Sequence, residues 1–440
     1  MRRNKIYQKD CFYTLLRYLV DYNIEYSYRK TEIRGEENIP EDGALIICPN
    51  HCNTLMDALV MLRAYKGSTV FGARADIFRR PLIAKIMYFL RILPMVRQRD
   101  GLRNVLKNQQ TQEIIVETLE NGVRFCLFPE GTHRTKHSLQ ALGKGALRIA
   151  LEANTRFGSE KPVYIIPTGI EYGDYFRYRS TSLVNYGKPI NVTEFIKNTD
   201  IENEAQQIDL LKKEVAAGIS ELITHIPAED NYDSKWALVK MLRIADTSKG
   251  YGDFGTSLHK GMEENRQTVD AIEKACTAHP EQMQELLERV KKFDKERIRR
   301  KISIYSFKKK DCTKWNVAGK GLAALIGLPY FIFSALVSLP MWAAALKIRS
   351  SVKDKAFMNT VSFGVKLGLG TILSIIYAIA AFCLTPWWLA LMLFALYVPS
   401  YAYFHDYIEG CRRWFSDMRL LRNKKMYKEF LDIVKTYRSI

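Results

Sequence analysis

Two long runs without a charged residue, both near the C-terminus, constrain the fold of this chain most strongly. Residues 321–346 form a run of 26, and residues 367–404 a run of 38. A helix needs roughly 20 apolar residues to cross the hydrocarbon core of a bilayer. The first run therefore predicts one membrane span. The second, with Pro386 near its middle, predicts either two spans in a tight hairpin or one long, kinked segment. A buried helical hairpin of a soluble protein is the alternative, but uncharged runs of this length are rare in soluble cores.

Basic clusters flank both ends of this apolar region. One lies at residues 297–310, and the other consists of Arg412, Arg413, Arg419, Arg422, Lys424 and Lys425. Because Lys and Arg are enriched on the cytoplasmic side of membrane proteins, both ends are expected in the cytoplasm, which favours an even number of crossings. We expect an integral membrane protein whose other main domain faces the cytoplasm.

The charge balance indicates which partners the chain prefers. The formal net charge is +19, which favours a phosphorylated substrate, an anionic bilayer surface or nucleic acid. The chain has no recognisable nucleic-acid reader motif, and its basic residues crowd around apolar segments. We therefore expect anionic membrane lipid and no nucleic acid as a partner. The eight cysteines are scattered without a CxxC pair, which is typical of a reducing compartment, and we expect no cleavable signal peptide.

Strands and helices alternate between residue 40 and about residue 226. Apolar runs predict strands at 44–48, 69–72, 92–96, 123–128, 163–167 and 182–186. Helical patterns separate them, at 54–65, 79–90, 103–120 and 143–156. Such alternation is typical of an α/β domain with a mostly parallel sheet flanked by helices.

These patterns divide the chain into five parts. Residues 1–30 are expected to hold an amphipathic, aromatic-rich helix, which either packs on a core or lies on a membrane surface. The α/β domain occupies residues 31–226, and residues 227–318 predict a charged helical appendage. A transmembrane region of two or more spans follows at 319–404, and a basic C-terminal tail at 405–440.

A histidine lies where the first predicted strand gives way to a helix. Pro49 ends the strand, and Asn53 and Thr54 signal the start of the helix, so His51 falls in a tight turn. Such a turn can fold His51 back toward Asp57, six residues later. A carboxylate there would hold one imidazole nitrogen and leave the other as a base toward a hydroxyl. The alternative is a capping box of Thr54 and Asp57, with His51 an ordinary loop histidine.

A second polar turn follows the predicted strand at 123–128. It contains Glu130, Gly131 and Thr132, followed by His133 and Arg134. Exposed backbone amides at Gly131 and Thr132, beside cationic neighbours, would suit a phosphate. An ordinary polar turn at a strand end is the alternative.

A metal site is an alternative interpretation of the histidines. His133 and His137 are four residues apart and could join His51 and Asp57 as ligands. We expect no metal, because the Glu130-Gly-Thr turn and its basic neighbours fit phosphate binding better.

Taken together, the two turns resemble the motifs of the glycerol-3-phosphate and lysophosphatidate acyltransferase family. The motifs are Asn50-His51 with Asp57 and, about seventy residues later, Phe128-Pro129-Glu130-Gly131-Thr132. Weaker matches lie, in the family's order, at residues 35–40, 93–97, 144–146 and 163–169. The resemblance covers about residues 30–226, and the combination is specific although each motif alone is weak.

The resemblance implies an activity. A membrane-bound enzyme would move a fatty acyl group from acyl-CoA or acyl carrier protein to the hydroxyl of glycerol 3-phosphate or lysophosphatidate, in phospholipid biosynthesis. His51 would be the general base and Asp57 the carboxylate that orients it. No acyl-enzyme is required, and no cofactor beyond the acyl donor is implied. Pro167 would shape the acyl-donor side. The glycerol phosphate end of the acceptor would be bound by Arg97, Glu130, Gly131, Thr132, His133 and Arg134.

Two departures from the family pattern bear on the acceptor. Five residues separate His51 from Asp57, whereas the commonest family form has four. The longer spacing resembles the branch containing fungal-type glycerol-3-phosphate/dihydroxyacetone-phosphate acyltransferases and favours glycerol 3-phosphate. His133 stands where many members have arginine, so the phosphate contact falls to His133 or Arg134.

A non-enzymatic function is the other class considered. The chain would then be a membrane-anchored lipid-binding scaffold with a degenerate acyltransferase domain. The intact His51, Asp57 and Glu130 argue against it.

Overall fold

The computed structural model describes residues 5–8, 10–96, 105–199, 203–227, 231–246, 257–308 and 313–440. The chain forms two compact units, each considered by itself below. Unit 1 comprises Met1–Ile24, Thr31–Glu171 and Ser182–Ile223. Unit 2 comprises Glu25–Lys30, Tyr172–Thr181 and Thr224–Ile440, so it includes the ends of three strands whose other residues belong to unit 1.

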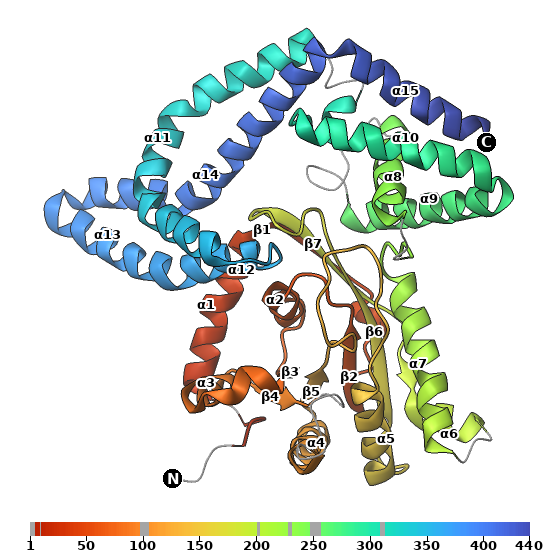
Figure 1. Ribbon diagram of the computed structural model, residues 1–440. Coiled ribbons are helices and arrows are strands. Elements are labelled where there is room, and N and C mark those ends of the chain that lie inside the picture. Colours follow the sequence, from red (N-terminus) through yellow and green to blue (C-terminus); the bar gives the residue numbers. More distant parts are fainter. Residues whose placement is uncertain are drawn as a thin grey trace. The chain divides into compact units, whose positions relative to one another are not determined.

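A mostly parallel sheet carries unit 1 (Figure 1). Its spatial order is β1 (Tyr28–Arg34), β7 (Ser180–Tyr186), β6 (Val163–Tyr172), β2 (Ala44–Pro49), β5 (Arg124–Cys126), β3 (Thr69–Arg74) and β4 (Ile92–Met95), with β8 (Ile190–Asn191) antiparallel to β6. The central strand β2 runs parallel to β5 and β6, and β3 runs parallel to β4 and β5. Every residue of β2 is buried, as expected for a strand covered on both faces.

Helices cover both faces of this sheet (Figure 1). The helices of this part of the chain are α1 (Cys11–Ser27), α2 (Leu55–Ala64), α3 (Pro81–Phe89), α4 (Val105–Glu120), α5 (Gly145–Phe157), α6 (Val192–Asn198) and α7 (Glu204–Glu221). On one face, Ile46 of β2 packs in a single apolar cluster with Ile115 of α4, Leu147 of α5 and Val215 of α7. The buried helix α2 lies across β2 from α5 and α7. The predicted fold class, a mostly parallel sheet flanked by helices, is confirmed.

Strand β1 is absent from the predicted strands. Its sequence, YRKTEIR, carries four charged residues in seven, and one of them, Glu32, is buried. A strand with a buried carboxylate lacks the apolar alternation from which strands are predicted.

Four helices of unit 2 form an apolar core of their own (Figure 1). They are α8 (Tyr232–Asp246), α9 (Leu258–Ala278), α10 (Pro280–Arg299) and α15 (Lys424–Ser439). Leu238, Leu286, Phe293 and Phe430 lie in one cluster of buried side chains. The structure differs here from the predicted basic tail at 405–440. Basic residues on the exposed face of α15 hid its apolar face, which buries Met426, Phe430, Ile433 and Val434.

Three stretches of unit 2 are long and apolar enough to cross a membrane, among the residues described. They are α11 (Lys314–Ser351), the continuous helix Phe357–Leu384 and α14 (Trp387–Arg422). The second joins α12 (Phe357–Val365) and α13 (Thr371–Leu384) through a π-helical turn at Lys366–Gly370. The second uncharged run therefore breaks into two helices at Pro386, as in the hairpin alternative. Three candidate spans are an odd number, which does not match the even number expected from the flanking charges.

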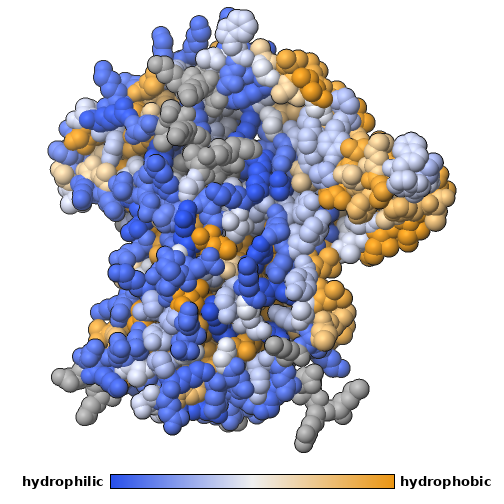
Figure 2. All heavy atoms as spheres, turned by 180° about the vertical axis from the view of Figure 1, so that it is seen from behind, coloured by the Kyte–Doolittle hydropathy of each residue, from blue (hydrophilic) through white to orange (hydrophobic). Residues whose placement is uncertain are grey.

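The side chains of these helices are largely exposed. Ile372, Ile375, Ile376 and Ile379 of α13 are each more than half exposed. Figure 2 shows apolar residues gathered on the surface at the right of that view. Long apolar helices with apolar surfaces are what a bilayer solvates and water does not.

Helices α11 and α14 pack closely against each other. The ring of Phe331 stacks on that of Tyr407, with 4.2 Å between centroids. The Tyr403 hydroxyl donates to the carbonyl of Gly327 at 3.0 Å, and a Cβ at Gly327 would lie 2.3 Å from that hydroxyl. The absence of a side chain at Gly327 is therefore what lets the Tyr403 hydroxyl reach the Gly327 carbonyl.

Candidate active site

The first turn of the site is fixed by Asn50, at the end of β2. Its side chain accepts a hydrogen bond from the backbone N–H of Ile170 at 2.6 Å and donates to the Ile170 carbonyl at 3.1 Å. The Asn50 side chain thus continues the hydrogen bonding between β2 and β6 beyond Pro49, where the backbone pairing of the two strands ends. The next residue, His51, is thereby placed at the carboxyl end of a central parallel strand, where α/β folds carry their sites.

His51 and Asp57 form a hydrogen-bonded pair. His51 Nδ1 lies 2.7 Å from Asp57 Oδ2, and the Asp57 side chain is fully buried. The same oxygen accepts backbone N–H groups from Cys52 at 2.8 Å and Asn53 at 2.7 Å. Three donors therefore hold the carboxylate in one position, and the imidazole is oriented with Nε2 as its remaining nitrogen.

The capping-box alternative is not what the structure contains. Thr54 makes no side-chain capping hydrogen bond at the start of α2, and its φ is +49°. Such a φ is strained for a β-branched residue and is typical of turns that position functional groups. Asp57 binds the turn that precedes the helix and the imidazole of His51.

The His51 ring is held by aromatic contacts as well. It stacks on Phe128, with 4.4 Å between centroids, and lies edge-on to His133 at 5.8 Å. His51 retains only part of its surface, with 18% of its side chain exposed. The imidazole is oriented on one side by Asp57 and flanked by the turn after β5.

Cys52 is the nucleophilic residue nearest to His51 in the sequence. Its thiol is buried, and burial raises the pKa of the Cys52 thiol well above its usual value, with the nearby Asp57 acting in the same direction. A thiol held neutral is a poor nucleophile. The geometry accordingly does not favour a covalent acyl-cysteine.

Glu130 connects the two turns. One carboxylate oxygen, Oε1, accepts the backbone N–H of His51 at 2.6 Å, and the other, Oε2, accepts the backbone N–H of Gln140 at 3.1 Å. Burial raises the pKa of Glu130, and these hydrogen bonds oppose that shift. Both oxygens thus bind the protein's own backbone, whereas the family resemblance implies a contact with the glycerol phosphate end.

The backbone of the second turn is engaged in the same way. Gly131 has φ +65°, and its N–H donates to the Phe128 carbonyl at 3.1 Å. The expectation that this amide is exposed to a phosphate is wrong, because the turn closes on it. The Thr132 carbonyl accepts from the Gln140 side chain at 2.8 Å. Arg134 donates its backbone N–H to the His51 carbonyl at 3.1 Å and places its guanidinium on Ser138.

Two of the residues named from the sequence lie elsewhere. Arg97 falls outside the described residues. Pro167 is buried within β6, where its ring packs toward Gly218 of α7: a Cβ at Gly218 would lie 2.8 Å from Pro167 Cγ. The structure therefore brings together His51, Asp57, Glu130, Gly131, Thr132, His133 and Arg134, and it leaves Pro167 in the sheet interior.

Gln140 is a site residue that sequence reasoning missed. It holds Glu130 through its backbone N–H and Thr132 through its side chain, yet it lies ten residues beyond Glu130 in an irregular segment. No periodicity or motif marks it. A second buried pair, His137 Nδ1 to Glu171 Oε1 at 3.6 Å, was missed for the same reason.

Among the described residues there is no group of three or more His, Cys, Asp and Glu side chains that could hold a metal ion.

Several known proteins resemble part of this chain. Residues 30–171 match the family model described as Acyltransferase. Over 155 residues the chain is 28% identical to the 1-acyl-sn-glycerol-3-phosphate acyltransferase BAT2, chloroplastic, of Brassica napus, covering 33% of this chain and 42% of that protein. It is 27% identical over 157 residues to the Arabidopsis thaliana 1-acyl-sn-glycerol-3-phosphate acyltransferase LPAT1, chloroplastic, covering 33% of this chain and 40% of that protein.

Two further similarities are also to proteins named as acyltransferases. A probable 1-acyl-sn-glycerol-3-phosphate acyltransferase of Mycoplasma pneumoniae is 27% identical over 132 residues, which cover 28% of this chain and 46% of that protein. The crystal structure of the 1-acyl-sn-glycerophosphate acyltransferase PlsC from Thermotoga maritima aligns with a TM-score of 0.34 and 19% identity, covering 49% of this chain and 85% of that chain.

The class of protein follows from the family match and the site. Residues 30–171 match the acyltransferase family model, so the resemblance predicted from the two motifs is confirmed over that part of the chain. More particularly, the curated relatives that it resembles are named 1-acyl-sn-glycerol-3-phosphate acyltransferases, and the chain spans less than half the length of each.

Proposed function

We propose that this protein is a membrane-bound O-acyltransferase of phospholipid biosynthesis. It moves a fatty acyl group from acyl-CoA or acyl carrier protein to the hydroxyl of glycerol 3-phosphate or lysophosphatidate. The observation that carries the proposal is the 2.7 Å contact of His51 Nδ1 with the buried Asp57 carboxylate, at the end of a central strand. The names of the relatives support the glycerolipid acceptor.

The reaction proceeds by direct transfer. His51 Nε2 takes the proton of the acceptor hydroxyl as that oxygen attacks the acyl carbonyl, and Asp57 stabilises the imidazolium that forms. When the tetrahedral intermediate collapses, the bond to the donor sulfur breaks and the ester bond remains. The thiolate that leaves receives the proton from His51, so the base returns to its starting state.

The turn after β5 binds the phosphate end of the acceptor. The family resemblance gives Arg97, Glu130, Gly131, Thr132, His133 and Arg134 as candidates for this contact, all but Arg97 from this turn. His133 is favoured among them because its ring lies beside that of His51, 5.8 Å between centroids. Glu130 has a different role in this proposal: it holds the two turns in register through backbone hydrogen bonds, rather than contacting substrate.

The apolar helices anchor the enzyme, with the acyltransferase domain on the cytoplasmic side. Their length and composition support the anchoring. A net charge of +19 supports attraction to anionic headgroups, which contributes about 1 kcal/mol for each basic residue near the surface. Acceptor and product partition into the bilayer, so an anchored site shortens their exposure to water.

The test is acyl transfer by purified full-length protein with a labelled acyl donor and two acceptors in parallel. Product from glycerol 3-phosphate would make this a first-step enzyme and give weight to the longer His51–Asp57 spacing. Product from lysophosphatidate alone would make it a second-step enzyme. Absence of product with both acceptors and with other lyso-lipids would overturn the proposal and leave the scaffold function.

A further inference from the structure

A groove lies between the first turns of α11 and the last turns of α14, both helices of unit 2. Its volume is about 510 Å³, and small-molecule sites are typically clefts of about 300–1,000 Å³ with a mainly apolar lining. Every residue that lines this groove is uncharged except Lys314. The groove therefore suits a ligand that is mostly apolar and carries one anionic group.

The indole of Trp414 forms one wall of the groove and is held in place by α11. Its Nε1 donates a hydrogen bond to the Val317 carbonyl at 2.9 Å. A Cβ at Gly321 would lie 2.8 Å from Trp414 Cζ2, so the glycine leaves room for the ring. Because this wall is already ordered, a ligand binds without the entropic cost of ordering it, which favours affinity.

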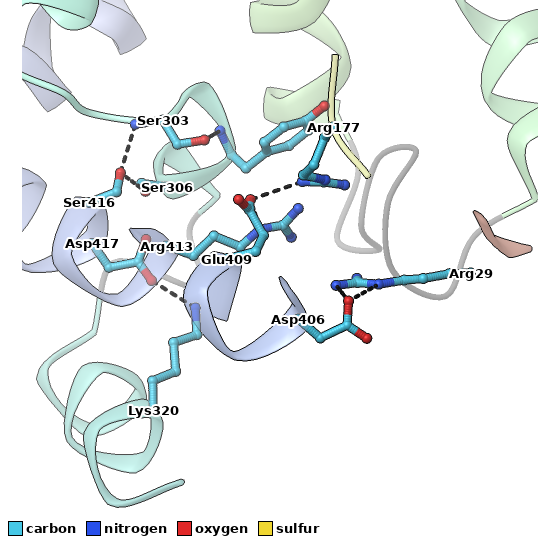
Figure 3. A network of polar contacts seen from close by, with 11 residues as sticks. Arg29, Arg177, Ser303, Ser306, Lys320, Asp406, Glu409, Arg413, Ser416 and Asp417 are labelled. Atoms are coloured by element: carbon cyan, nitrogen blue, oxygen red, sulfur yellow. Dashed lines mark hydrogen bonds and ion pairs between the residues drawn. The ribbon is translucent and has the colours of Figure 1, made fainter. Parts of the chain in front are cut away.

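An ion pair beside the groove joins the same two helices (Figure 3). Lys320 Nζ lies 2.8 Å from Asp417 Oδ2, and the Asp417 side chain is buried. Lys314 differs, because it is exposed and has no ion-pair partner among the residues that the structure describes. It also begins α11, whose amino-terminal end carries a partial positive charge. Lys314 is therefore the cation of this groove that remains for an anion.

The groove crosses the border between the polar and apolar parts of α11. Lys314 and Lys320 precede the uncharged run that begins at Gly321. Leu322 and Leu325, which line the other end of the groove, are each more than half exposed and belong to a helix long and apolar enough to cross a membrane. From Lys314 to Leu325 the helix rises by about 16 Å. In a bilayer, the lysine end of the groove lies at the depth of the headgroups and the leucine end among the acyl chains.

We propose that the groove between α11 and α14 binds one anionic phospholipid. One acyl chain lies against Trp414 and Leu325, and Lys314 holds the phosphate through a charge-assisted contact. A membrane lipid is favoured over a soluble ligand because the apolar lining continues into the exposed apolar surface of a helix long enough to cross a bilayer. An anionic headgroup is favoured because the charge at the groove is positive. None of these residues is among those around His51, so the proposal goes beyond acyl transfer.

The first test maps lipid contacts on the wild-type, full-length protein in neutral detergent. The probe is phosphatidylglycerol with a photoreactive diazirine in one acyl chain, added at a few molecules per protein. After illumination, mass spectrometry of the digested protein locates the adducts. We expect adducts within residues 314–325 and 414–421, which unlabelled phosphatidylglycerol prevents more effectively than phosphatidylcholine or inorganic phosphate does.

Two pairs of variants test the acyl-chain contact and the phosphate contact separately. Ala318→Phe places a ring in the groove, whereas Ala323→Phe adds the same ring at an exposed position of α11 outside it. Lys314→Met removes the charge at the groove, whereas Lys347→Met removes that of an exposed lysine near the other end of the helix. Native mass spectrometry measures the affinity for phosphatidylglycerol, and thermal unfolding shows whether each variant is folded.

Ala318→Phe and Lys314→Met are each expected to bind phosphatidylglycerol at least about tenfold more weakly than their controls, because the first fills the groove and the second removes a charge-assisted contact. Equal affinity within either pair would overturn the proposal. So would wild-type adducts that lie outside both segments, or that phosphatidylcholine or inorganic phosphate prevents as well as phosphatidylglycerol does. A wild-type dimer that Ala318→Phe dissociates would assign the groove to a second copy of the chain and would also overturn it. None of these readouts requires acyl transfer, so failure of the proposed enzymatic function leaves the test unaffected.

Discussion

Replacing Asp57 with asparagine is expected to abolish most of the activity while leaving the site's geometry in place. The two backbone N–H groups of Cys52 and Asn53, at 2.8 and 2.7 Å, hold one side-chain oxygen toward His51. An asparagine oxygen can accept the same bonds, so Asp57→Asn keeps the imidazole oriented. What it removes is the negative charge that stabilises the imidazolium formed during transfer.

The magnitude follows from the geometry. Opposite charges about 4 Å apart, at an effective dielectric constant of about 20, attract by roughly 4 kcal/mol. Since each 1.36 kcal/mol changes a rate about tenfold, kcat should fall by about 10³-fold. The substrates do not touch Asp57 in this account, so KM should change little.

The assay is the steady-state rate of acyl transfer by purified protein with the acceptor saturating, alongside thermal unfolding of the same preparations. A kcat within about tenfold of the wild type, in a variant that is folded, would refute the reasoning that the Asp57 charge stabilises the transition state.

Three further perturbations test the remaining parts of the account. Because burial raises the pKa of Glu130 above 4.5, its contribution to stability is fully present at low pH and is lost as the pH rises through the folded pKa. Glu130→Gln should remove this loss of stability, which thermal unfolding from acidic to neutral pH measures. A pH dependence identical to that of the wild type would count against the assignment. Gln140→Ala should raise the KM for the acceptor several-fold and leave the KM for the acyl donor unchanged, because about 1 kcal/mol of hydrogen bonding to the Thr132 turn is lost. The control is Gln282→Ala, which changes an exposed glutamine. An effect of Gln140→Ala no larger than that of the control would contradict the positioning role. Gly327→Ala should lower the free energy of unfolding by about 1–3 kcal/mol through overpacking against Tyr403, whereas Gly319→Ala on the same helix, which meets open space, should not; equal melting temperatures in detergent would argue against this contact.

The central strands were predictable because parallel strands buried on both faces are continuous apolar runs, as residues 44–47 show. Strand β1 was not, since its polar sequence carries a buried Glu32 whose partners come from elsewhere in the fold. The apolar face of α15 was hidden by the four lysines and one arginine on its exposed face. In each case the missing information is tertiary, because the neighbouring element decides which side chains are buried.

The site shows the same division. The spacing of His51 and Asp57 predicted their pairing, because one turn of chain brings the two together. The partners of Glu130 could not be predicted, since the two N–H groups that it binds belong to His51 and Gln140, 79 residues before and ten residues after it. The N–H of Gly131, predicted to be exposed, donates to the Phe128 carbonyl inside the turn. The sequence could not show this, because only the folded backbone determines where an N–H points.

The most direct test of the central claim is the rate of acyl transfer to a glycerol phosphate acceptor by His51→Ala. The matched control is His259→Ala, which removes a histidine from α9 of unit 2. General-base catalysis contributes about 10²–10⁴-fold, so the account predicts a loss of that size in His51→Ala, with wild-type thermal unfolding and a control that turns over normally. Transfer at the wild-type rate by folded His51→Ala would contradict the claim that this histidine is the base.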